Sequence, residues 1–308
     1  MDISKTNPEA LPGAYQVLLY YQYVPIEDPQ SFAREHLAFC RDLGLKGRIL
    51  VAAEGINGTV SGTLSATETY METMHADPRF REMVFKVDPH DSHAFKKMHV
   101  RHKAELVTFR VPKDLDPNQK SGTRLTPEQF REAMHAEDVL ILDGRTDYEY
   151  DLGHFKNAIR PDVRSFREFP DWIRENLASY KDKKILTYCT GGIRCEKLTA
   201  FMLEEGFQDV SQLEGGIVTY GKDPEVGGDG FDGKCFVFDE RLSVPVNQVE
   251  ETIVGKCFHC GQPTENYINC ANDRCHRLHL CCPSCEEEHR GYCSPSCKTT
   301  IQKEERHA

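Results

Sequence analysis

This 308-residue chain lacks several sequence features that would assign it to a class of protein, such as membrane or secreted proteins. It has no run of about 18 consecutive apolar residues, so the sequence predicts no membrane span. Its first residues, MDISKTNPEALPG, lack the charged-then-apolar order of a secretory signal. We therefore expect a cytoplasmic protein with no membrane partner.

Positive charge and cofactor motifs are also scarce. Lys and Arg number 38 against 49 Asp and Glu, which gives a formal net charge of −11. This balance argues against nucleic-acid binding through the whole surface, although a local basic patch is compatible with it. The chain has no GxGxxG fingerprint for a flavin or nicotinamide, no convincing triad of two His and one carboxylate, and no internal repeat.

Cysteine is sparse in most of the chain and dense near its end. The first 256 residues hold four cysteines, and nine more lie between Cys257 and Cys297. In a cytosolic protein such a cluster binds metal or performs redox chemistry more often than it forms disulfides. We expect a structural zinc that holds a small tail without a large core. Disulfides are the competing interpretation.

The cysteine spacing suggests two sets of ligands, although it cannot assign their pairing. Two CxxC pairs form the first set, and four further cysteines are available for the second; His residues nearby are possible substitutes. The first set is Cys257, Cys260, Cys282 and Cys285; the second is Cys270, Cys275, Cys293 and Cys297; the histidines are His259, His276, His279 and His289.

The first block, roughly residues 13–112, alternates between strand and helix patterns. We expect strands at 14–24, on both sides of a turn within 47–62, and at 104–111. Helices are expected at 28–45, with an apolar face of Phe32, Leu37, Phe39 and Leu43, and at 65–80, with Ser65 as N-cap. The order strand, helix, strand, strand, helix, strand predicts a ferredoxin-like, split βαβ domain.

The second block follows a predicted linker at 112–124. A helix is expected from Pro127, capped by Thr126. Strands at 139–143 and 183–189 alternate with helices around 169–177 and from Cys195 to Glu205. This pattern predicts an α/β domain with a parallel sheet, so that the whole chain is α+β. Residues 223–235, which are rich in glycine and acid, are expected to form a second connector.

The stretch KKILTYCTGGIRCEK places a thiol, Cys189, at the carboxyl end of a predicted strand. Ligands of parallel α/β sheets bind at this edge. Backbone N–H groups of the turn Thr190, Gly191, Gly192 and Ile193, the following helix N-terminus and the charge of Arg194 all favour a thiolate. We interpret Cys189 as a nucleophile; a buried cysteine at a strand end is the alternative.

The number of residues between the cysteine and the arginine limits which substrate group the loop can hold. Protein tyrosine phosphatases use Cys-x5-Arg, whereas only four residues separate Cys189 from Arg194. The smaller loop suits a single sulfur atom or the edge of a small ring better than a phosphoryl group.

Together with DGRTDYEYDLGHFKNAI upstream, the loop resembles the rhodanese domain. The resemblance implies that Asp143 and Arg145 lie near the loop at the end of the preceding strand. Gly153, His154 and Ala158 fit the Gly-His-x-x-x-Ala pattern of rhodaneses, and we expect His154 to have a packing or capping role.

A wider resemblance covers nearly the whole chain. HLAFCRDLGLKGRILVAAEGINGTVSG, HAFKKMHVRHKAELV, CTGGIRCEK and CFHCGQPTENYINC resemble the rhodanese-like tRNA uridine hydroxylases. The resemblance implies an oxidoreductase that converts wobble uridine in the tRNA anticodon loop to 5-hydroxyuridine, with molecular oxygen as co-substrate and Cys189 essential. One departure is Gly144, where an apolar residue is more usual; we expect it to loosen the strand end slightly.

These observations divide the chain into a ferredoxin-like domain at 1–115 that contacts RNA, a rhodanese domain at 116–222 and a Cys-rich, zinc-binding tail at 223–308.

A basic segment, HDSHAFKKMHVRHKAEL, is a candidate RNA contact because cations mixed with aromatic rings bind single strands. Its cations are Lys96, Lys97, Arg101 and Lys103, interleaved with His90, His93, His99 and His102, and Phe95 is available to stack. Arg160, Arg164 and Arg167 are candidates to extend the surface. A solvated charged face is the alternative. The turn expected around Asn57 in AEGINGT is either a structural hairpin or a substrate-facing loop.

Our mechanistic hypothesis is that the Cys189 thiolate adds to C6 of uracil and makes C5 electron-rich. Cys195 either resolves an oxidised or persulfidated Cys189 or packs inside the helix, and we expect packing. Two other functions compete with hydroxylation. One is a sulfurtransferase that carries a persulfide on Cys189, and the other is a noncatalytic RNA or protein adaptor. The sequence names no protein partner.

Overall fold

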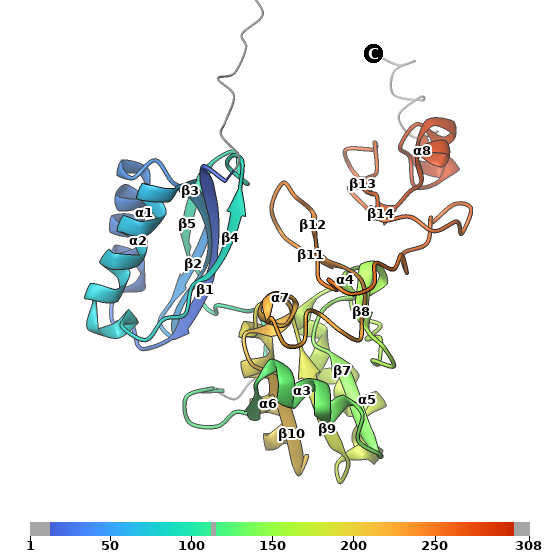
Figure 1. Cartoon of the computed structure of the whole chain (residues 1–308), viewed down its shortest axis with the longest axis horizontal. Coiled ribbons are helices and arrows are strands. Elements are labelled where there is room, and N and C mark those ends of the chain that lie inside the picture. Colours follow the sequence, from blue (N-terminus) through green and yellow to red (C-terminus); the bar gives the residue numbers. More distant parts are fainter. Residues whose placement is uncertain (1–12, 112–114, 299–308) are drawn as a thin grey trace, which may run out of the picture. The chain divides into compact units, whose positions relative to one another are not determined.

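The computed structural model describes residues 13–111 and 115–298 of the chain (Figure 1). Its contacts define two compact units. Unit 1 is the chain up to Thr108 together with Asp116–Gln119 and Asp239–Arg241, and unit 2 is the remainder. Within the two described ranges, no helix has both the length and the apolar character that a membrane crossing needs.

Unit 1 contains a five-stranded sheet with two helices. Its elements are β1 (Tyr15–Tyr23), α1 (Pro29–Asp42), β2 (Lys46–Ala52), β3 (Gly55–Thr63), α2 (Leu64–Ala76), β4 (Lys86–His90) and β5 (Met98–His102). The strand order is β4-β1-β3-β2-β5, with β5 parallel to β2 and the other pairs antiparallel. The first six elements follow the ferredoxin-like order, so the predicted fold of this block is confirmed.

Both helices of unit 1 cover the same face of the sheet (Figure 1). The strands present alternate apolar residues to that face, so Leu18 and Tyr20 of β1 are fully buried. On α1 the most deeply buried side chains are Ala33, His36 and Cys40. The predicted apolar residues of this helix, such as Phe32 and Leu37, pack around that stripe and are partly buried.

The strand predicted at 104–111 is wrong. The last strand of the ferredoxin-like motif is β4, which pairs with β1, and the edge beside β2 is taken by β5. Residues 104–111 form no strand: the N–H of Leu106 donates to the Glu54 carboxylate instead of to a neighbouring strand, and Phe109 is buried in a hydrophobic cluster of unit 2.

Two local predictions in unit 1 also need correction. The N-cap of α2 is Thr63 and not Ser65, because the Thr63 side chain accepts the hydrogen bond from the N–H of Ala66. The turn between β2 and β3 lies at residues 53–54, so Asn57 is a strand residue paired with Leu50. The structure therefore favours a structural hairpin over a loop at Asn57.

Unit 2 is built on a four-stranded parallel sheet. Its elements to residue 222 are β6 (Thr123–Leu125), α3 (Pro127–Met134), β7 (Val139–Asp143), α4 (Asp147–Leu152), β8 (Gly153–Phe155), α5 (Phe169–Asn176), β9 (Lys184–Tyr188), α6 (Ile193–Glu204), β10 (Asp209–Leu213) and α7 (Gly216–Lys222). The sheet order is β6-β10-β9-β7. All its pairs are parallel, as predicted.

The parallel sheet is buried on both faces. Successive residues of β9 point to opposite sides, so Ile185 packs in one hydrophobic cluster with Phe169 and Leu186 packs in another with Phe155. The predicted cap of α3 is confirmed, since the side chain of Thr126 accepts from the N–H of Gln129.

The predicted connector at 223–235 is wrong for its last five residues. β11 (Phe231–Phe236) lies there and pairs with β8 and with β12 (Ser243–Pro245). Val226 and Phe231 are buried in the same cluster as Phe155, so this segment completes the core of unit 2. Part of the other predicted linker, residues 112–114, lies outside the described residues, and that linker ends before β6 begins at Thr123.

The remaining elements are β13 (Tyr267–Asn269), β14 (Leu278–Leu280) and α8 (Pro283–His289). β13 and β14 form an antiparallel hairpin. Figure 1 shows these small elements grouped in the C-terminal module of unit 2.

Candidate active site and metal centres

The cysteine loop joins β9 to α6. β9 ends at Tyr188, Cys189 follows, and α6 begins at Ile193 with Gly192 as its N-cap. Gly192 has a φ of 103°, a conformation that a side chain would strain, so glycine is required where the loop turns into the helix. The helix starts two residues earlier than the predicted start at Cys195, which places Arg194 in its first turn.

Hydrogen-bond donors converge on the sulfur of Cys189. The N–H of Gly192 donates to Sγ at 3.1 Å, and both the thiol and the backbone N–H of Cys195 also donate to it. Burial by itself would raise the pKa of Cys189. These donors and the positive charge of Arg194 outweigh burial and lower the pKa of Cys189 to about 6. The sulfur is therefore mainly a thiolate at neutral pH.

Arg194 is held by a carboxylate from another helix. Its Nη1 and Nη2 atoms each lie 2.7 Å from an oxygen of Glu149 on α4, and Nη2 also donates to the Thr190 hydroxyl at 3.2 Å. Burial would raise the pKa of Glu149, but the charge and hydrogen bonds of Arg194 lower it. The guanidinium thus keeps a fixed position beside the loop.

The sequence analysis did not identify Glu149, although a local signal for it exists. Thr146 and Glu149 form the capping box of α4, a T-x-x-E pattern that fixes the carboxylate against the helix start. Glu149 is fully buried, and its hydrogen bond to Thr146 leaves it aimed at Arg194.

Asp143 and Arg145 lie at the end of β7 as a fully buried ion pair, with Nη2 and Oδ2 2.7 Å apart. The hydroxyl of Tyr188 donates to Asp143, and Arg145 donates to the carbonyl of Gly153. This network ties the ends of β7 and β9 together and so supports the loop. We assign the pair a positioning role, not contact with substrate.

Gly144 does not loosen the strand end as expected. Its N–H donates to the carbonyl of Tyr188 at 2.8 Å. A Cβ at this position would lie 2.9 Å from that carbonyl oxygen and 3.2 Å from Leu198. Glycine is required here because two backbones and a helix approach closely.

The Cys189 thiolate is covered. Cys189 is 1 % exposed, Gly191, Gly192 and Ile193 are buried, and Thr190 is half-buried. A further buried thiol, Cys235 of β11, contacts Thr190 through a side-chain hydrogen bond, and burial raises the pKa of Cys235 to about 11. Any molecule that reacts with Sγ therefore reaches it only when side chains over the loop move.

Cys195 is fully buried in α6 and contacts Cys189 directly. Burial, together with its hydrogen bond to the Cys189 sulfur, raises the pKa of Cys195 well above its ordinary value. The cysteine thus packs inside the helix, as expected, and also acts as a protonated donor to the thiolate. His154 stacks on Tyr150 and hydrogen-bonds to the Tyr150 carbonyl, in accord with a packing role.

The candidate RNA-contacting residues are distributed over both units. In unit 1, Lys96, Lys97, Arg101 and Lys103 are exposed on and beside the edge strand β5. Lys96 lies 3.2 Å from Glu240 in an exposed ion pair.

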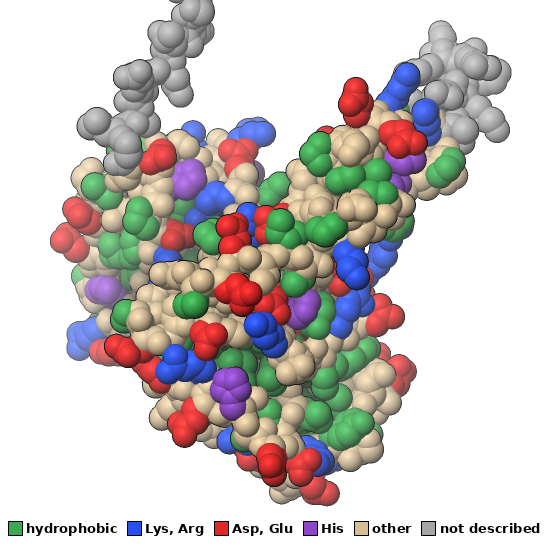
Figure 2. Space-filling view, turned by 45° about the vertical axis from the view of Figure 1, so that its right-hand side comes forward, with side chains coloured by type: hydrophobic (Ala, Val, Ile, Leu, Met, Phe, Trp, Pro, Cys, Tyr) green, Lys and Arg blue, Asp and Glu red, His purple; other side chains and the backbone are tan. Residues whose placement is uncertain are grey.

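In unit 2, Arg160 is bound to Asp151 at 2.6 Å, and Arg164 lies 3.7 Å from Asp147. Arg167 donates to the Ser165 hydroxyl. Cationic side chains are visible on the flank of unit 2 beside the C-terminal module (Figure 2).

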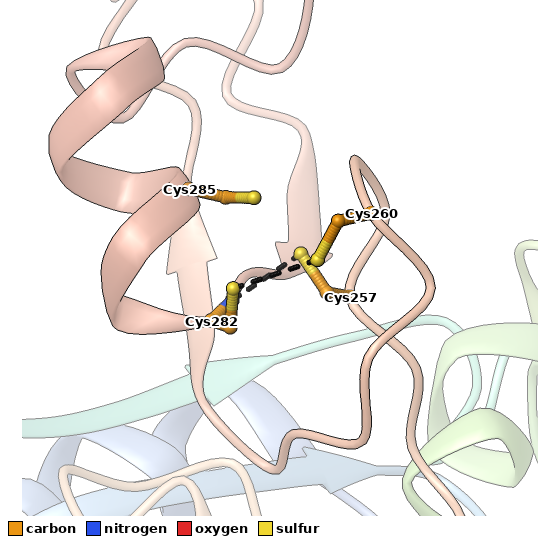
Figure 3. Close-up of side chains that lie close together, drawn as sticks. All are labelled: Cys257, Cys260, Cys282 and Cys285. Carbon is orange, nitrogen blue, oxygen red and sulfur yellow. Dashed lines mark hydrogen bonds between the residues drawn. The ribbon is translucent and has the colours of Figure 1, made fainter.

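Eight cysteines of the C-terminal module form two quartets of sulfur atoms. Within each quartet all sulfurs lie within 4.8 Å of one another; the first is Cys257, Cys260, Cys282 and Cys285, shown in Figure 3, and the second is Cys270, Cys275, Cys293 and Cys297. Both sets match the two predicted from spacing.

The sulfur separations fit a tetrahedral metal ion. Sγ of Cys260 lies 3.7 Å from that of Cys282, and Sγ of Cys293 lies 3.7 Å from that of Cys275 and 3.6 Å from that of Cys297. Four sulfurs at about 2.3 Å from a zinc ion are about 3.8 Å apart, whereas a disulfide needs about 2.05 Å. All thirteen cysteines lie in the described residues and are free thiols. The Cys-rich module can therefore bind metal.

The fold and the loop define a class of protein. The chain matches the models of the UPF0176 acylphosphatase like domain at residues 15–106, the rhodanese-like domain at 126–223 and the rhodanase C-terminal region at 232–298. It is thus a rhodanese-like protein with an acylphosphatase-like N-terminal domain.

Curated relatives specify the family. A tRNA uridine(34) hydroxylase of Bacillus licheniformis is 60% identical over 284 residues, which cover 92% of this chain and 88% of the relative. The tRNA uridine(34) hydroxylase of Shouchella clausii is 58% identical over 285 residues, with 92% and 88% covered. The chain belongs to the tRNA uridine(34) hydroxylase family. A solved rhodanese-like domain protein from Staphylococcus aureus is 28% identical, with a TM-score of 0.27, over 32% of this chain and 91% of that chain.

Proposed function

We propose that this chain hydroxylates the wobble uridine of tRNA, uridine 34, to 5-hydroxyuridine with molecular oxygen and with Cys189 as the nucleophile. The observation that carries this proposal is a thiolate with a pKa of about 6, held by three donors in the loop of a chain 60% identical to a tRNA uridine(34) hydroxylase. The activity is that of an oxidoreductase.

The thiolate supplies the nucleophile that uracil chemistry needs. Addition of the Cys189 sulfur to C6 of the base breaks the C5–C6 double bond and leaves C5 electron-rich. One atom of dioxygen then bonds to C5 and the other leaves as water, which consumes two electrons and two protons from a thiol-class reductant. Loss of the C5 proton and departure of the sulfur restore the double bond and free Cys189.

Residues around the loop keep the Cys189 sulfur in its thiolate form. Cys195 and Gly192 donate to the sulfur, and Arg194 adds positive charge while Glu149 fixes the guanidinium. Because Cys189 is 1 % exposed, the base must be extruded from the anticodon loop and the cover over the cysteine loop must open. The base is expected to enter beside Thr190, because this residue of the turn is half-buried.

Other parts of the chain have supporting roles in the proposal. Lys96, Lys97, Arg101 and Lys103 in the domain at 1–115 contact the anticodon arm, and the rhodanese domain at 116–222 carries the chemistry. In the tail at 223–308 each cysteine quartet holds one structural zinc ion, which supplies the folding energy that a small module without a large core needs. Closed sets of four thiolates leave no open position for catalysis.

The test is nucleoside mass spectrometry on bulk tRNA from cells lacking the protein, cells with it restored and cells carrying Cys189→Ala. A uridine species heavier by one oxygen should appear only with intact Cys189. Cys40→Ser is the control, since it changes another buried thiol, in the core of unit 1, that belongs to neither the loop nor its surroundings. If that species is unchanged while thiolated uridines fall, the sulfurtransferase hypothesis replaces ours. If no nucleoside changes, the protein is an adaptor.

The covalent step has its own test. RNA that carries 5-fluorouridine at the wobble position cannot lose a proton from C5, so the adduct with Cys189 should persist and shift the mass of the protein. No adduct under turnover conditions would refute attack at C6 without refuting hydroxylation.

A further inference from the structure

A groove runs beside α4, between the rhodanese part of unit 2 and the C-terminal module. Its volume is about 800 Å³. One wall contains Asp147, Tyr148 and Asp151 of α4, and the opposite wall contains Lys256, Phe258 and residues of β14. The Cys189 nucleophile and its neighbours do not line this groove, so the groove has no role in the chemistry described above.

Three Lys and Arg side chains line the groove, and two of them differ from several other cations of unit 2 in having no carboxylate partner among the described residues. Arg160, Arg174 and Arg194 are each bound to a carboxylate at 2.6–2.7 Å. By contrast, Lys256 and Arg277 both line the groove, and within the part of the chain that the structure describes neither is in an ion pair. In a protein of net charge −11, two unpaired cations facing one groove are available for a bound anion.

The acidic side chains of the groove are already neutralised. Asp151 is bound to Arg160 at 2.6 Å, and Asp147 lies 4.0 Å from Arg160 and 3.7 Å from Arg164. Lys256 and Arg277 therefore determine the sign of the local potential, which favours a negatively charged ligand.

An exposed aromatic ring lines the groove beside Arg277. Phe258 is 47 % exposed, and the guanidinium carbon of Arg277 lies 4.4 Å from its ring centroid. An arginine stacked on an exposed ring presents planar and cationic surfaces together. Proteins bind unpaired bases and their phosphates with this combination.

We propose that this groove binds single-stranded RNA of the tRNA substrate, with Lys256 and Arg277 on the phosphates and Phe258 against a base. The inference rests on the proposed function and assigns a substrate contact to the C-terminal module. The helix α4 connects the two sites, because Asp147 and Asp151 line the groove and Glu149 on the same helix holds Arg194 at the cysteine loop. RNA in the groove therefore passes one helix away from the nucleophile.

The test compares charge reversals within one module. Affinity for an unmodified full-length tRNA transcript is measured over a range of salt concentrations for Arg277→Glu, Lys256→Glu and the control Arg290→Glu. Arg290 is exposed at the end of α8 and lies outside the groove. Because each contact with a single strand contributes about 0.7 to the slope of log affinity against log salt, each groove variant should lower that slope by about 0.7. The control should leave it unchanged.

Phe258→Ala tests the stacking contact separately. Its affinity should fall about fivefold or more with an unchanged salt slope, since stacking carries no charge. The metal content and the thermal unfolding midpoint show whether each variant keeps its fold. If the C-terminal module of Arg277→Glu unfolds, Lys256→Gln is measured in its place. Equal affinities for the groove variants and Arg290→Glu would overturn the proposal.

Failure of this inference and failure of the proposed function give different results. Cys189→Ala should bind the transcript as the parent does and form no 5-hydroxyuridine. If the parent hydroxylates tRNA while the groove variants bind it normally, only the groove proposal fails. If the groove variants lose binding but the parent forms no 5-hydroxyuridine, the groove proposal stands and the proposed function fails.

Discussion

The clearest prediction concerns Arg194, which we expect to lower the pKa of Cys189 without touching the substrate. The pKa of Cys189 falls from 9.0 to about 6, which corresponds to about 4 kcal/mol in favour of the thiolate. An opposite charge within a few ångströms typically contributes about 1–3 pKa units. Removing the guanidinium should therefore raise the pKa of Cys189 to about 7–9.

The experiment needs a second substitution at Glu149, because removing one partner of a buried ion pair lowers the free energy of unfolding by about 3–5 kcal/mol. Arg194→Gln alone leaves a fully buried carboxylate unpaired, whereas the double variant Arg194→Gln/Glu149→Gln keeps two neutral groups in contact. We expect the single variant to be the less stable of the two. The single variant should raise the pKa of Cys189 at least as much as the double variant does, because an ionised Glu149 also disfavours the thiolate.

The assay is the pH dependence of kcat/KM for formation of 5-hydroxyuridine, whose acid limb reports the essential thiolate. For the parent the limb should be centred near pH 6. For the double variant it should move to about pH 7–9, so the rate at pH 7 falls about two- to hundredfold and recovers above about pH 10. A limb that stays near pH 6, or a rate that alkaline pH does not restore, would refute the electrostatic role of Arg194.

Three further predictions concern neighbouring features. Cys195→Ala should move the same acid limb to higher pH, because it removes a hydrogen-bond donor to the thiolate. Cys195→Ser keeps a donor, so its limb should lie between those of the parent and of Cys195→Ala. Equal limbs for the two variants would contradict the donor role of Cys195. Gly144→Ala should lower the free energy of unfolding by about 1–3 kcal/mol in urea, since its Cβ would meet the carbonyl of Tyr188 at 2.9 Å; no change would show that the strand end can yield. Cys257→Ser should reduce bound zinc from about two ions to about one per chain by elemental analysis, and retention of both would contradict the quartet.

The motifs of the candidate site could be predicted from the sequence because each consists of residues that are close together in the chain. A strand pattern that ends at Cys189, two glycines and the start of a helix predict the loop, since each element depends on residues close in the chain. The first cysteine quartet followed from two CxxC pairs and the second from four further cysteines nearby in the chain, and the structure places the sulfurs of each quartet together. The order of strands and helices likewise indicated both α/β units.

Local patterns failed where an element depends on distant partners. Residues 223–235 look like a connector because of their glycines, yet Phe231 pairs with Phe155 and is buried. The apolar run at 104–111 looks like a strand, yet the Glu54 side chain binds the N–H of Leu106, and Phe109 is buried in a cluster of unit 2. Side-chain periodicity cannot show which sheet edge is already occupied.

The sequence alone thus determined the cysteine loop, the helix that follows it and the two cysteine sets of the C-terminal module, because backbone conformation and residue spacing are short-range properties. Tertiary structure decided what surrounds them. Glu149 reaches Arg194 across 45 residues, and Lys256 and Arg277 share a groove with α4 through the folding of the C-terminal module. Such contacts depend on how complete elements pack, and packing is set by buried surface from the whole unit instead of by any one segment.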